Sequence, residues 1–244
     1  MTVKEHYDNH LGYFYSWMTG DFENNQIDFQ NFFVEQKLLP QSSKVAIDLG
    51  AGRGVQSVVL AKNGYSVKAI DFNVQLLKEL TANTKGLNVE VIDADMRNVG
   101  IFCEYNPELI VCCGDTIAHL DSKQEMLQFI TTISHTLSNG GKFLLSFRDY
   151  SVELTGDKRF IPVKSDDNKI LTCILDYQAD YIIVTDLLHE KIGNIWNQKV
   201  SSYKKVRITT EMISAMIEQT GMKLQLNRTL NGMTTIIAQK NASR

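Results

Sequence analysis

Long apolar runs are missing from this sequence of 244 residues. A membrane helix needs roughly 18 to 20 consecutive apolar residues, and the longest runs here have only the length of a strand. The first eight residues include Lys4, Glu5, His6 and Asp8, so this segment is too polar for a signal peptide. We therefore expect a cytoplasmic protein with no membrane partner.

An excess of basic residues is missing as well. Lysine and arginine total 25 against 28 for aspartate and glutamate, which gives a formal net charge of −3. Proteins that coat nucleic acid usually carry a strong positive charge, so this balance argues against a nucleic-acid partner. No C-x-x-C pair occurs, so we predict buried thiols in a reducing compartment and no metal site. The cysteines are Cys103, Cys112, Cys113 and Cys173.

Proline is scarce, with three residues against fifteen glycines. The rest of the composition is ordinary, because 43% hydrophobic and 22% charged residues are typical of a soluble globular protein and argue against disorder. The length allows one large domain, or a core domain that carries an insertion, in a monomer or a homodimer.

A strand–helix alternation occupies the first part of the sequence. Short apolar stretches predict five strands, with helices predicted after the first, second and fourth. This spacing is typical of βαβ units with right-handed crossovers and therefore of a mostly parallel sheet. Ser122 and Glu125 predict a capping box at the start of the last of these helices. The predicted strands are 45–49, 67–71, 89–92, 109–113 and 142–147.

The alternation stops after the fifth strand. Residues 150–208 show no helical pattern and predict antiparallel strands at 170–175, 181–188 and 195–206. A helix near 210–220 and two strands at 223–227 and 234–239 then restore the α/β pattern. We predict an α/β fold with a Rossmann-like, mostly parallel seven-stranded sheet and an antiparallel β insertion after strand five. The predicted organisation is an N-terminal helical cap (1–43), a ligand-binding domain (44–149 and 209–244) and an insertion covering the substrate site (150–208).

A glycine-rich turn follows the first predicted strand, at the sheet edge where open parallel sheets bind their ligands. The strand contains Asp48 and opens onto Gly50, Gly52 and Gly54. A dinucleotide-binding loop needs its third glycine at position 55, which is Val55 here. A carboxylate beside a helix N-terminus also disfavours a pyrophosphate. The turn favours a ligand that has an ammonium group and no phosphate.

A family resemblance is carried by the segment Asp48-Leu49-Gly50-Ala51-Gly52-Arg53-Gly54, which is similar to the D-x-G-x-G-x-G loop of class I S-adenosylmethionine-dependent methyltransferases. The later landmarks of that family follow in order, across about residues 44–148 and 209–239. They are Asp71 after strand two, Asp95-Met96 after strand three, Cys112-Cys113-Gly114-Asp115 after strand four, and the segment 137–143, where Asn139 replaces the family's proline.

The resemblance implies S-adenosylmethionine as the cofactor and S-adenosylhomocysteine as the product. It gives Asp71 the role of accepting hydrogen bonds from the ribose hydroxyls, and it places adenine beside Asp95 and Met96. The cofactor-binding residues that we expect are Asp48, Gly50, Ala51, Gly52, Asp71, Phe72, Asp95, Met96, Cys113 and, from an N-terminal aromatic segment, Tyr15.

Nucleic-acid adenine and glutamine amides are disfavoured as acceptors, because the segment after strand four lacks the N/D-P-P-aromatic loop typical of the enzymes that methylate them. Two further features favour a small molecule. The insertion after strand five can fold over the pocket and enclose a ligand. The segment Phe147-Arg148-Asp149-Tyr150 resembles the His-Arg-Asn-Tyr segment of glycine N-methyltransferases, whose arginine grips the substrate carboxylate. We therefore predict methyl transfer to an amine in a carboxylate-bearing metabolite, with the acidic group bound by Arg148.

Several residues near the predicted acceptor have competing interpretations. His119 is the nearest candidate for a general base, or it is a packing residue. Arg148 contacts the substrate, or it forms an ion pair with Asp149 or Glu153. The other predicted substrate contacts are Tyr150, Trp196 and Tyr203.

Three other functions stay open at this point. A small-molecule O-methyltransferase would use His119 or Asp115 to activate a hydroxyl. A sensor or scaffold would bind the cofactor without turnover. An RNA methyltransferase would use a cluster of basic residues in the insertion, which we interpret instead as a solvated strand face. The cluster comprises Lys199, Lys204, Lys205 and Arg207.

Overall fold

Five apolar segments form the parallel part of the main sheet in the computed structural model, which describes residues 1–230 and 232–241. These strands are β1 (Val45–Leu49), β2 (Ser66–Asp71), β3 (Val89–Asp93), β4 (Leu109–Cys112) and β5 (Lys142–Arg148). Antiparallel β10 (Met222–Leu230) and β11 (Met233–Lys240) extend the sheet from β5. Across the described residues the strand order is β10-β11-β5-β4-β1-β2-β3. The predicted mostly parallel, seven-stranded sheet is therefore confirmed.

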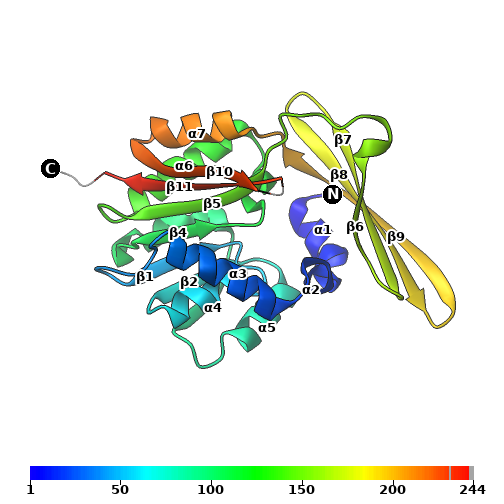
Figure 1. Cartoon of the computed structure of the whole chain (residues 1–244), viewed down its shortest axis with the longest axis horizontal. Coiled ribbons are helices and arrows are strands. Elements are labelled where there is room, and N and C mark those ends of the chain that lie inside the picture. The colour runs from blue at the N-terminus through cyan, green and yellow to red at the C-terminus, as the bar shows by residue number, and fades with distance from the viewer. Residues whose placement is uncertain (231, 242–244) are drawn as a thin grey trace.

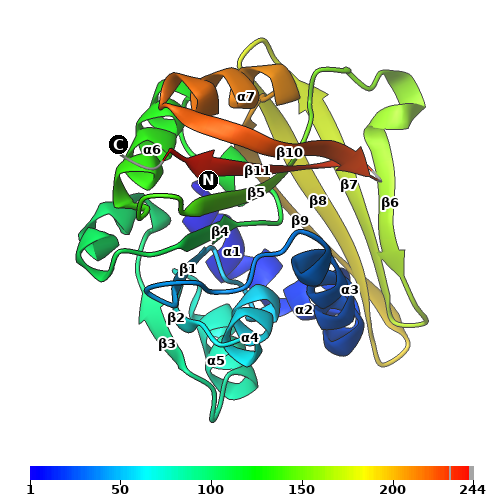
Figure 2. The ribbon, with the colours of Figure 1, turned by 60° about the vertical axis from the view of Figure 1, so that its left-hand side comes forward.

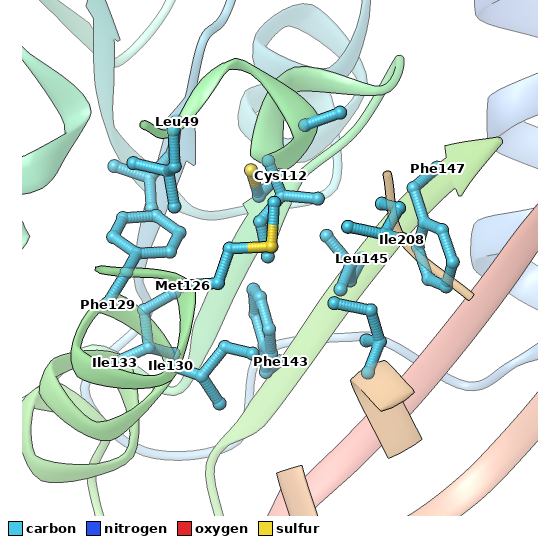
Figure 3. Close-up of a cluster of buried hydrophobic side chains, with 14 of the residues drawn as sticks. Leu49, Cys112, Met126, Phe129, Ile130, Ile133, Phe143, Leu145, Phe147 and Ile208 are labelled. Atoms are coloured by element: carbon cyan, nitrogen blue, oxygen red, sulfur yellow. The ribbon is translucent and has the colours of Figure 1, made fainter. Parts of the chain in front are cut away.

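Helices cover both faces of this sheet (Figure 1). One face packs on α3 (Phe22–Glu35) and α4 (Val55–Lys62), with α5 (Val74–Asn83) beside them. The other packs on α6 (Lys123–Thr136), α7 (Thr210–Gln219) and the 3-10 segment η2 (Met96–Tyr105). Figure 3 shows the second interface, where Met126, Phe129 and Ile130 of α6 meet strand residues such as Phe143 and Leu145. Burying both faces explains the nearly all-apolar sequences of the central strands.

The start of α6 differs from the expected capping box in one bond. The Ser122 hydroxyl accepts a hydrogen bond from the Glu125 amide at 3.1 Å, as predicted. The Glu125 carboxylate accepts from the Asp121 amide at 2.5 Å, one residue earlier than a capping box requires. The box is therefore only half formed, because Glu125 also pairs with Arg97 at 2.6 Å and is turned toward it.

The predicted insertion contains a separate antiparallel sheet of four strands within the described residues. They are β6 (Phe160–Ser165), β7 (Lys169–Tyr177), β8 (Tyr181–Ile192) and β9 (Ile195–Val206), preceded by a 3-10 turn, η4 (Gly156–Arg159). The sequence pattern missed β6. This edge strand contains Pro162, and its pairing with β7 shifts register between Pro162 and Lys164. Proline is found in sheets only on edge strands or at bulges, so its presence weakened the strand pattern here.

Short N-terminal helices lie between the two sheets in both views (Figures 1 and 2). They are α1 (Val3–Asn9), η1 (Leu11–Tyr13) and α2 (Tyr15–Thr19). Leu11 and Phe14 pack on Leu171 and Leu188 of the insertion, which fixes this segment against β7 and β8. In the part of the chain that the structure describes, no helix is both long and apolar enough to cross a membrane. The cytoplasmic location and the oligomeric state stay predictions.

Candidate active site

The glycine-rich turn between β1 and α4 forms one wall of the site at the carboxyl edge of the main sheet. Gly50 has a φ of +68°, and a Cβ there would lie 2.5 Å from the Thr116 side chain. Glycine is therefore required for the turn to approach η3 (Thr116–His119), which follows β4. Gly114 has a φ of +75°, and a Cβ on it would meet nothing within 4 Å, so its backbone borders open space.

Three cavities meet at this edge, and we name them by position. The inner cavity, of about 50 Å³, is lined by residues that include Tyr7, Tyr15, Gly50, Gly52, Asp71, Phe72, Met96 and His119. The loop cavity, of about 340 Å³, lies on the other side of the glycine-rich turn and includes Tyr15, Asp28, Ala51, Arg53 and Cys113. The outer cavity, of about 710 Å³, includes Lys4, Phe72, Asp95, Met96, His119, Lys204 and Lys205.

These cavities gather most of the residues expected to contact the cofactor. Phe72, Met96 and His119 border both the inner and the outer cavity, so the two are contiguous. Gly50, Gly52 and Tyr15 similarly connect the inner cavity to the loop cavity. Asp48 is the exception, because it lies behind the turn and lines none of the three.

Two buried carboxylates stand at the glycine-rich turn. Asp71 accepts hydrogen bonds from the backbone amides of Gly52 (2.8 Å) and Asn73 (2.9 Å), which explains its position at the inner cavity. Asp48 accepts one from the Ser57 hydroxyl at 2.6 Å. Burial raises the pKa of Asp71, and it raises the pKa of Asp48 to about 7.

Neither of these acids forms an ion pair among the described residues. Asp71 is the one of the two that lines the inner cavity, and a buried carboxylate without a cation there suits a ligand that brings its own positive charge and no phosphate. The residues present therefore fit a cationic nucleoside such as S-adenosylmethionine.

Asp95 lies at the rim of the outer cavity. Its carboxylate accepts from the Arg97 amide at 2.9 Å and pairs with the Arg97 guanidinium at 2.7 Å. It also caps η2. The predicted contact with adenine stays a prediction, and Met96 beside it reaches the inner cavity.

His119 is the titratable group placed where the inner and outer cavities meet. Its Nε2 lies 3.5 Å from the Tyr7 hydroxyl, and its Nδ1 is buried with no hydrogen-bond partner among the described residues. Burial lowers the pKa of His119 to about 3, and the nearby Lys205 ammonium adds to this effect. The imidazole is therefore neutral near pH 7 and has a nitrogen free to form a hydrogen bond.

Asp115 joins three segments of the chain. Its carboxylate accepts from the Arg148 amide (3.0 Å), from the Tyr150 hydroxyl (2.8 Å) and from the Lys205 ammonium (2.5 Å). Burial alone would raise the pKa of Asp115, but the Lys205 cation holds it below its usual value. Burial alone would lower the pKa of Lys205, but Asp115 raises it well above its usual value. Both groups are therefore charged.

The solvated strand face that we inferred for the basic cluster is thus wrong for Lys205. Its side chain is 11% exposed, because residues 201, 203 and 205 of β9 face α1 and the segment after β4, with a period of two. Arg207 is also largely engaged, since it donates to the carbonyls of Tyr150, Gln178 and Ser151. Lys199 pairs with Glu190 at 3.0 Å, and Lys204 lies over the Tyr181 ring.

The four predicted acceptor contacts divide into two pairs. Tyr150 is buried against Asp115, and Tyr203 is buried with its ring 5.7 Å from that of His119. Arg148 is exposed, with Nη1 near the turn between β10 and β11, and it lines none of the three cavities. Trp196 is 45% exposed next to the turn between β8 and β9. The roles of Arg148 and Trp196 stay predictions.

The alternative interpretation of Arg148 as a partner of Asp149 or Glu153 is wrong. Asp149 accepts hydrogen bonds from the Thr210 amide and hydroxyl at 2.7 and 2.5 Å. Glu153 pairs with Arg207 at 3.5 Å. Both acids are therefore held by residues that follow the insertion or end it.

Sequence reasoning missed three residues that complete the acceptor side. Tyr7 of α1 packs edge-on against His119 with ring centroids 5.7 Å apart. His6 stacks on Tyr203 at 4.1 Å and lies within hydrogen-bond distance of Ser201 (2.8 Å) and Asp186 (3.1 Å). Lys205 is the third. The alternation of β9 could have identified Lys205, but no local pattern places α1 against it.

Comparison with known proteins gives a family match for the part of the chain that contains the glycine-rich turn. Residues 46–141 match a family model described as a methyltransferase domain. A glycine/sarcosine/dimethylglycine N-methyltransferase from Actinopolyspora halophila is 27% identical over 125 residues, which are 49% of this chain but only 22% of that protein.

Solved structures match over nearly the whole chain. An S-adenosylmethionine-dependent methyltransferase from Clostridium acetobutylicum superposes with a TM-score of 0.74 at 16% identity, covering 91% of this chain and 93% of that one. S-adenosylmethionine-bound CalS10, an amino pentose methyltransferase from Micromonospora echinaspora, gives 0.71 at 14% identity, covering 91% and 92%. At this level of identity the structural matches establish the fold alone.

Proposed function

We propose that this chain, which belongs through residues 46–141 to the class I S-adenosylmethionine-dependent methyltransferases, transfers a methyl group to the nitrogen of a small-molecule acceptor. The observation that carries the proposal is the neutral, buried His119 at the junction of the inner and outer cavities, surrounded by Tyr7 and Tyr203. Such a group can orient an amine but cannot retain a proton near pH 7.

The cofactor side follows from the residues that line the inner and loop cavities. Asp71 would accept hydrogen bonds from the ribose, Phe72 and Met96 would flank the base, and Gly50 and Gly52 would allow close backbone approach. S-adenosylmethionine, when bound there, supplies a methyl group that its sulfonium already activates. The chain therefore has to align the acceptor and exclude water more than it has to activate anything.

The inner cavity is smaller than a nucleoside, because the Tyr7 ring lies between Tyr15, Phe72 and His119 at centroid distances of 5.7 to 6.2 Å. We expect α1 to shift when the cofactor binds. The aromatic rings that stay around the cofactor would then face a sulfonium, which the negative faces of aromatic rings attract.

The protonation state of His119 favours an amine over a hydroxyl. A neutral amine brings its own lone pair, and the neutral imidazole of His119, which lines the inner and outer cavities, can accept an N–H hydrogen bond that orients it. The proton that the methylated nitrogen then loses can go to water. A hydroxyl has to lose its proton during the reaction, and an imidazole with a pKa of about 3 is too weak a base for that.

A carboxylate on the acceptor is the finer part of the proposal. Its support is the similarity to a glycine/sarcosine/dimethylglycine N-methyltransferase and the cations that line the outer cavity. The insertion supplies Tyr203 and Lys205 to the acceptor side, which supports its predicted role as the cover of the substrate site.

The test is an assay of S-adenosylhomocysteine release over a panel of small amines, each matched with the alcohol of the same skeleton. We expect turnover with at least one amine, at a rate that rises with pH as that amine loses its proton. Turnover of alcohols alone would replace the proposal with O-methylation. Tight binding of S-adenosylhomocysteine with no turnover over the panel would favour a sensor or scaffold.

A further inference from the structure

A buried lysine faces the acceptor side of the site, and neither the glycine-loop motif nor the segment around Arg148 predicts it. The side chains of Lys205 and Asp115 are 11% and 4% exposed, and their ammonium and carboxylate groups lie 2.5 Å apart. Lys205 also lines the outer cavity next to His119. A buried ion pair is weak evidence for a role in stability, because an apolar pair of similar size is often as stable.

The two members of the pair differ in their remaining hydrogen-bonding capacity. Asp115 already accepts from the Arg148 amide, the Tyr150 hydroxyl and Lys205. The Lys205 ammonium has three N–H donors, and within the described residues its hydrogen bonds go to Asp115 alone. The pair therefore keeps two spare ammonium donors against about one spare carboxylate lone pair, so its unused capacity is mainly that of a donor and suits a negatively charged oxygen.

The other charges at the outer cavity are already paired or more exposed. Arg97 forms ion pairs with Asp95 (2.7 Å) and Asp121 (3.2 Å). Lys4 pairs with Asp8 at 2.7 Å, and its side chain is 58% exposed. Lys204 is exposed and lies over the Tyr181 ring. Lys205 is thus the cation of this cavity that is both buried and fixed in position.

We propose that Lys205, held in place by Asp115, binds the carboxylate of the acceptor and thereby determines specificity for amines that carry an acidic group. This inference rests on the proposed function for the identity of the site. It differs from the sequence prediction, which gave the carboxylate to the exposed Arg148. His119 lies at the same cavity, so the two residues would bind the two ends of one short acceptor.

The test separates carboxylate binding from methyl transfer. Binding to the complex with S-adenosylhomocysteine is measured by calorimetry for glycine, β-alanine, 4-aminobutyrate and phenylalanine, each against its primary amide. In the wild-type protein we expect at least one acid to bind about tenfold or more tightly than its amide, the size of one charge-assisted hydrogen bond. A panel in which no acid binds better than its amide would overturn the proposal.

The informative variant is Lys205→Met combined with Asp115→Asn, because Lys205→Met alone leaves a buried carboxylate unpaired and can prevent folding. We expect this double variant to bind S-adenosylhomocysteine normally and to lose the preference for acids. Lys205→Arg keeps the charge and should retain part of it. Lys199→Met, an exposed lysine of the same strand, and Arg148→Ala should leave it unchanged.

Two results would contradict the role of Lys205. If the double variant still prefers acids to amides, Lys205 does not bind the carboxylate. If Arg148→Ala loses that preference, Arg148 binds the carboxylate instead. The proposed function fails separately, if no amine is methylated. A Lys205-dependent preference without methylation would leave the inference standing for a site that binds amino acids.

Discussion

The two sides of the site contain buried carboxylates in opposite electrostatic situations. On the cofactor side, Asp48 and Asp71 have no cationic partner among the described residues, and burial raises the pKa of both. On the acceptor side, Asp115 is equally buried, but Lys205 holds its pKa below the usual value. The comparison shows that burial alone does not assign a role to an acid. An unpaired acid that lines a cavity, as Asp71 does, suits a cationic ligand, whereas a paired acid positions its partner.

The largest effect should come from breaking the pair on the acceptor side. Asp115→Asn leaves the Lys205 ammonium buried without a counter-charge, so we expect the free energy of unfolding to fall by about 3 to 5 kcal/mol. Urea denaturation at pH 7 measures it. Adding Lys205→Met should restore part of the loss, because the double variant buries no charge at this position. A single variant as stable as the wild type would mean that the pair is solvated.

The second effect concerns ligand binding on the cofactor side. Asp71→Asn removes the negative charge that faces the inner cavity, so we expect the affinity for S-adenosylhomocysteine to fall about 100-fold, as for one or two charged hydrogen bonds. Calorimetry measures the dissociation constant. Glu90→Gln on the neighbouring strand β3 is the matched control, because Glu90 pairs with Lys68 at the surface. If the two variants change the dissociation constant equally, Asp71 does not contact the ligand.

Replacing Asp48 should stabilise the folded protein, whereas replacing Asp115 should destabilise it. The pKa of Asp48 is raised from 3.8 to about 7 in the folded protein, so folding favours its protonated form. This stabilisation is complete below about pH 4 and is lost as the pH rises through 7. Asp48→Asn should therefore raise the free energy of unfolding at pH 8, by at most about 4 kcal/mol in the absence of ligand, and leave it nearly unchanged at pH 4. A variant that is destabilised at pH 8 would contradict the unpaired state of Asp48.

The smallest effect concerns His119, which lies between the two sides. His119→Gln keeps a hydrogen-bonding group without a titratable ring, so we expect kcat to fall about tenfold, the size of one hydrogen bond. The shape of the pH–rate profile should stay the same, because a pKa of about 3 lies outside the working range. If the wild-type rate depends on a group that titrates near neutral pH and the variant lacks this dependence, His119 acts as a general base and the prediction is wrong.

The same histidine gives a stability signal of its own. The pKa of His119 is lowered from 6.5 to about 3 by folding, so its contribution to stability is present above about pH 6.5 and is lost as the pH falls toward 3. The unfolding of His119→Gln should accordingly depend less on pH over that range. This trend is opposite to that of Asp48.

The cofactor side could be predicted because its residues are close together in the sequence. Gly50 and Gly52 lie in one turn, and Asp71 ends the next strand. A parallel sheet brings the carboxyl ends of its strands to one edge, so motifs that each follow a strand come together in space. Asp48 shows the limit of this reasoning, because its side chain turns to Ser57 behind the turn and away from the cavities.

The acceptor side could not be predicted in the same way. Asp115 and Lys205 are 90 residues apart, and Tyr7 and His119 are 112 apart. Arg148 lies in the more recognisable motif. At the end of β5, however, the backbone amide of Arg148 and not its guanidinium contacts Asp115. Lys205 had the weaker pattern, since a cluster of lysines on a strand usually indicates a solvated face.

The sequence by itself determined the five strands of the parallel core, the antiparallel insertion and the residues of the glycine-rich turn. These follow from periodicity, turn residues and motif spacing, all of which act over short stretches of chain. Only the tertiary structure decided which side chains of the insertion and of α1 meet η3. That choice depends on how the second sheet packs against the first, and burial then sets whether each acid, lysine or histidine there is charged.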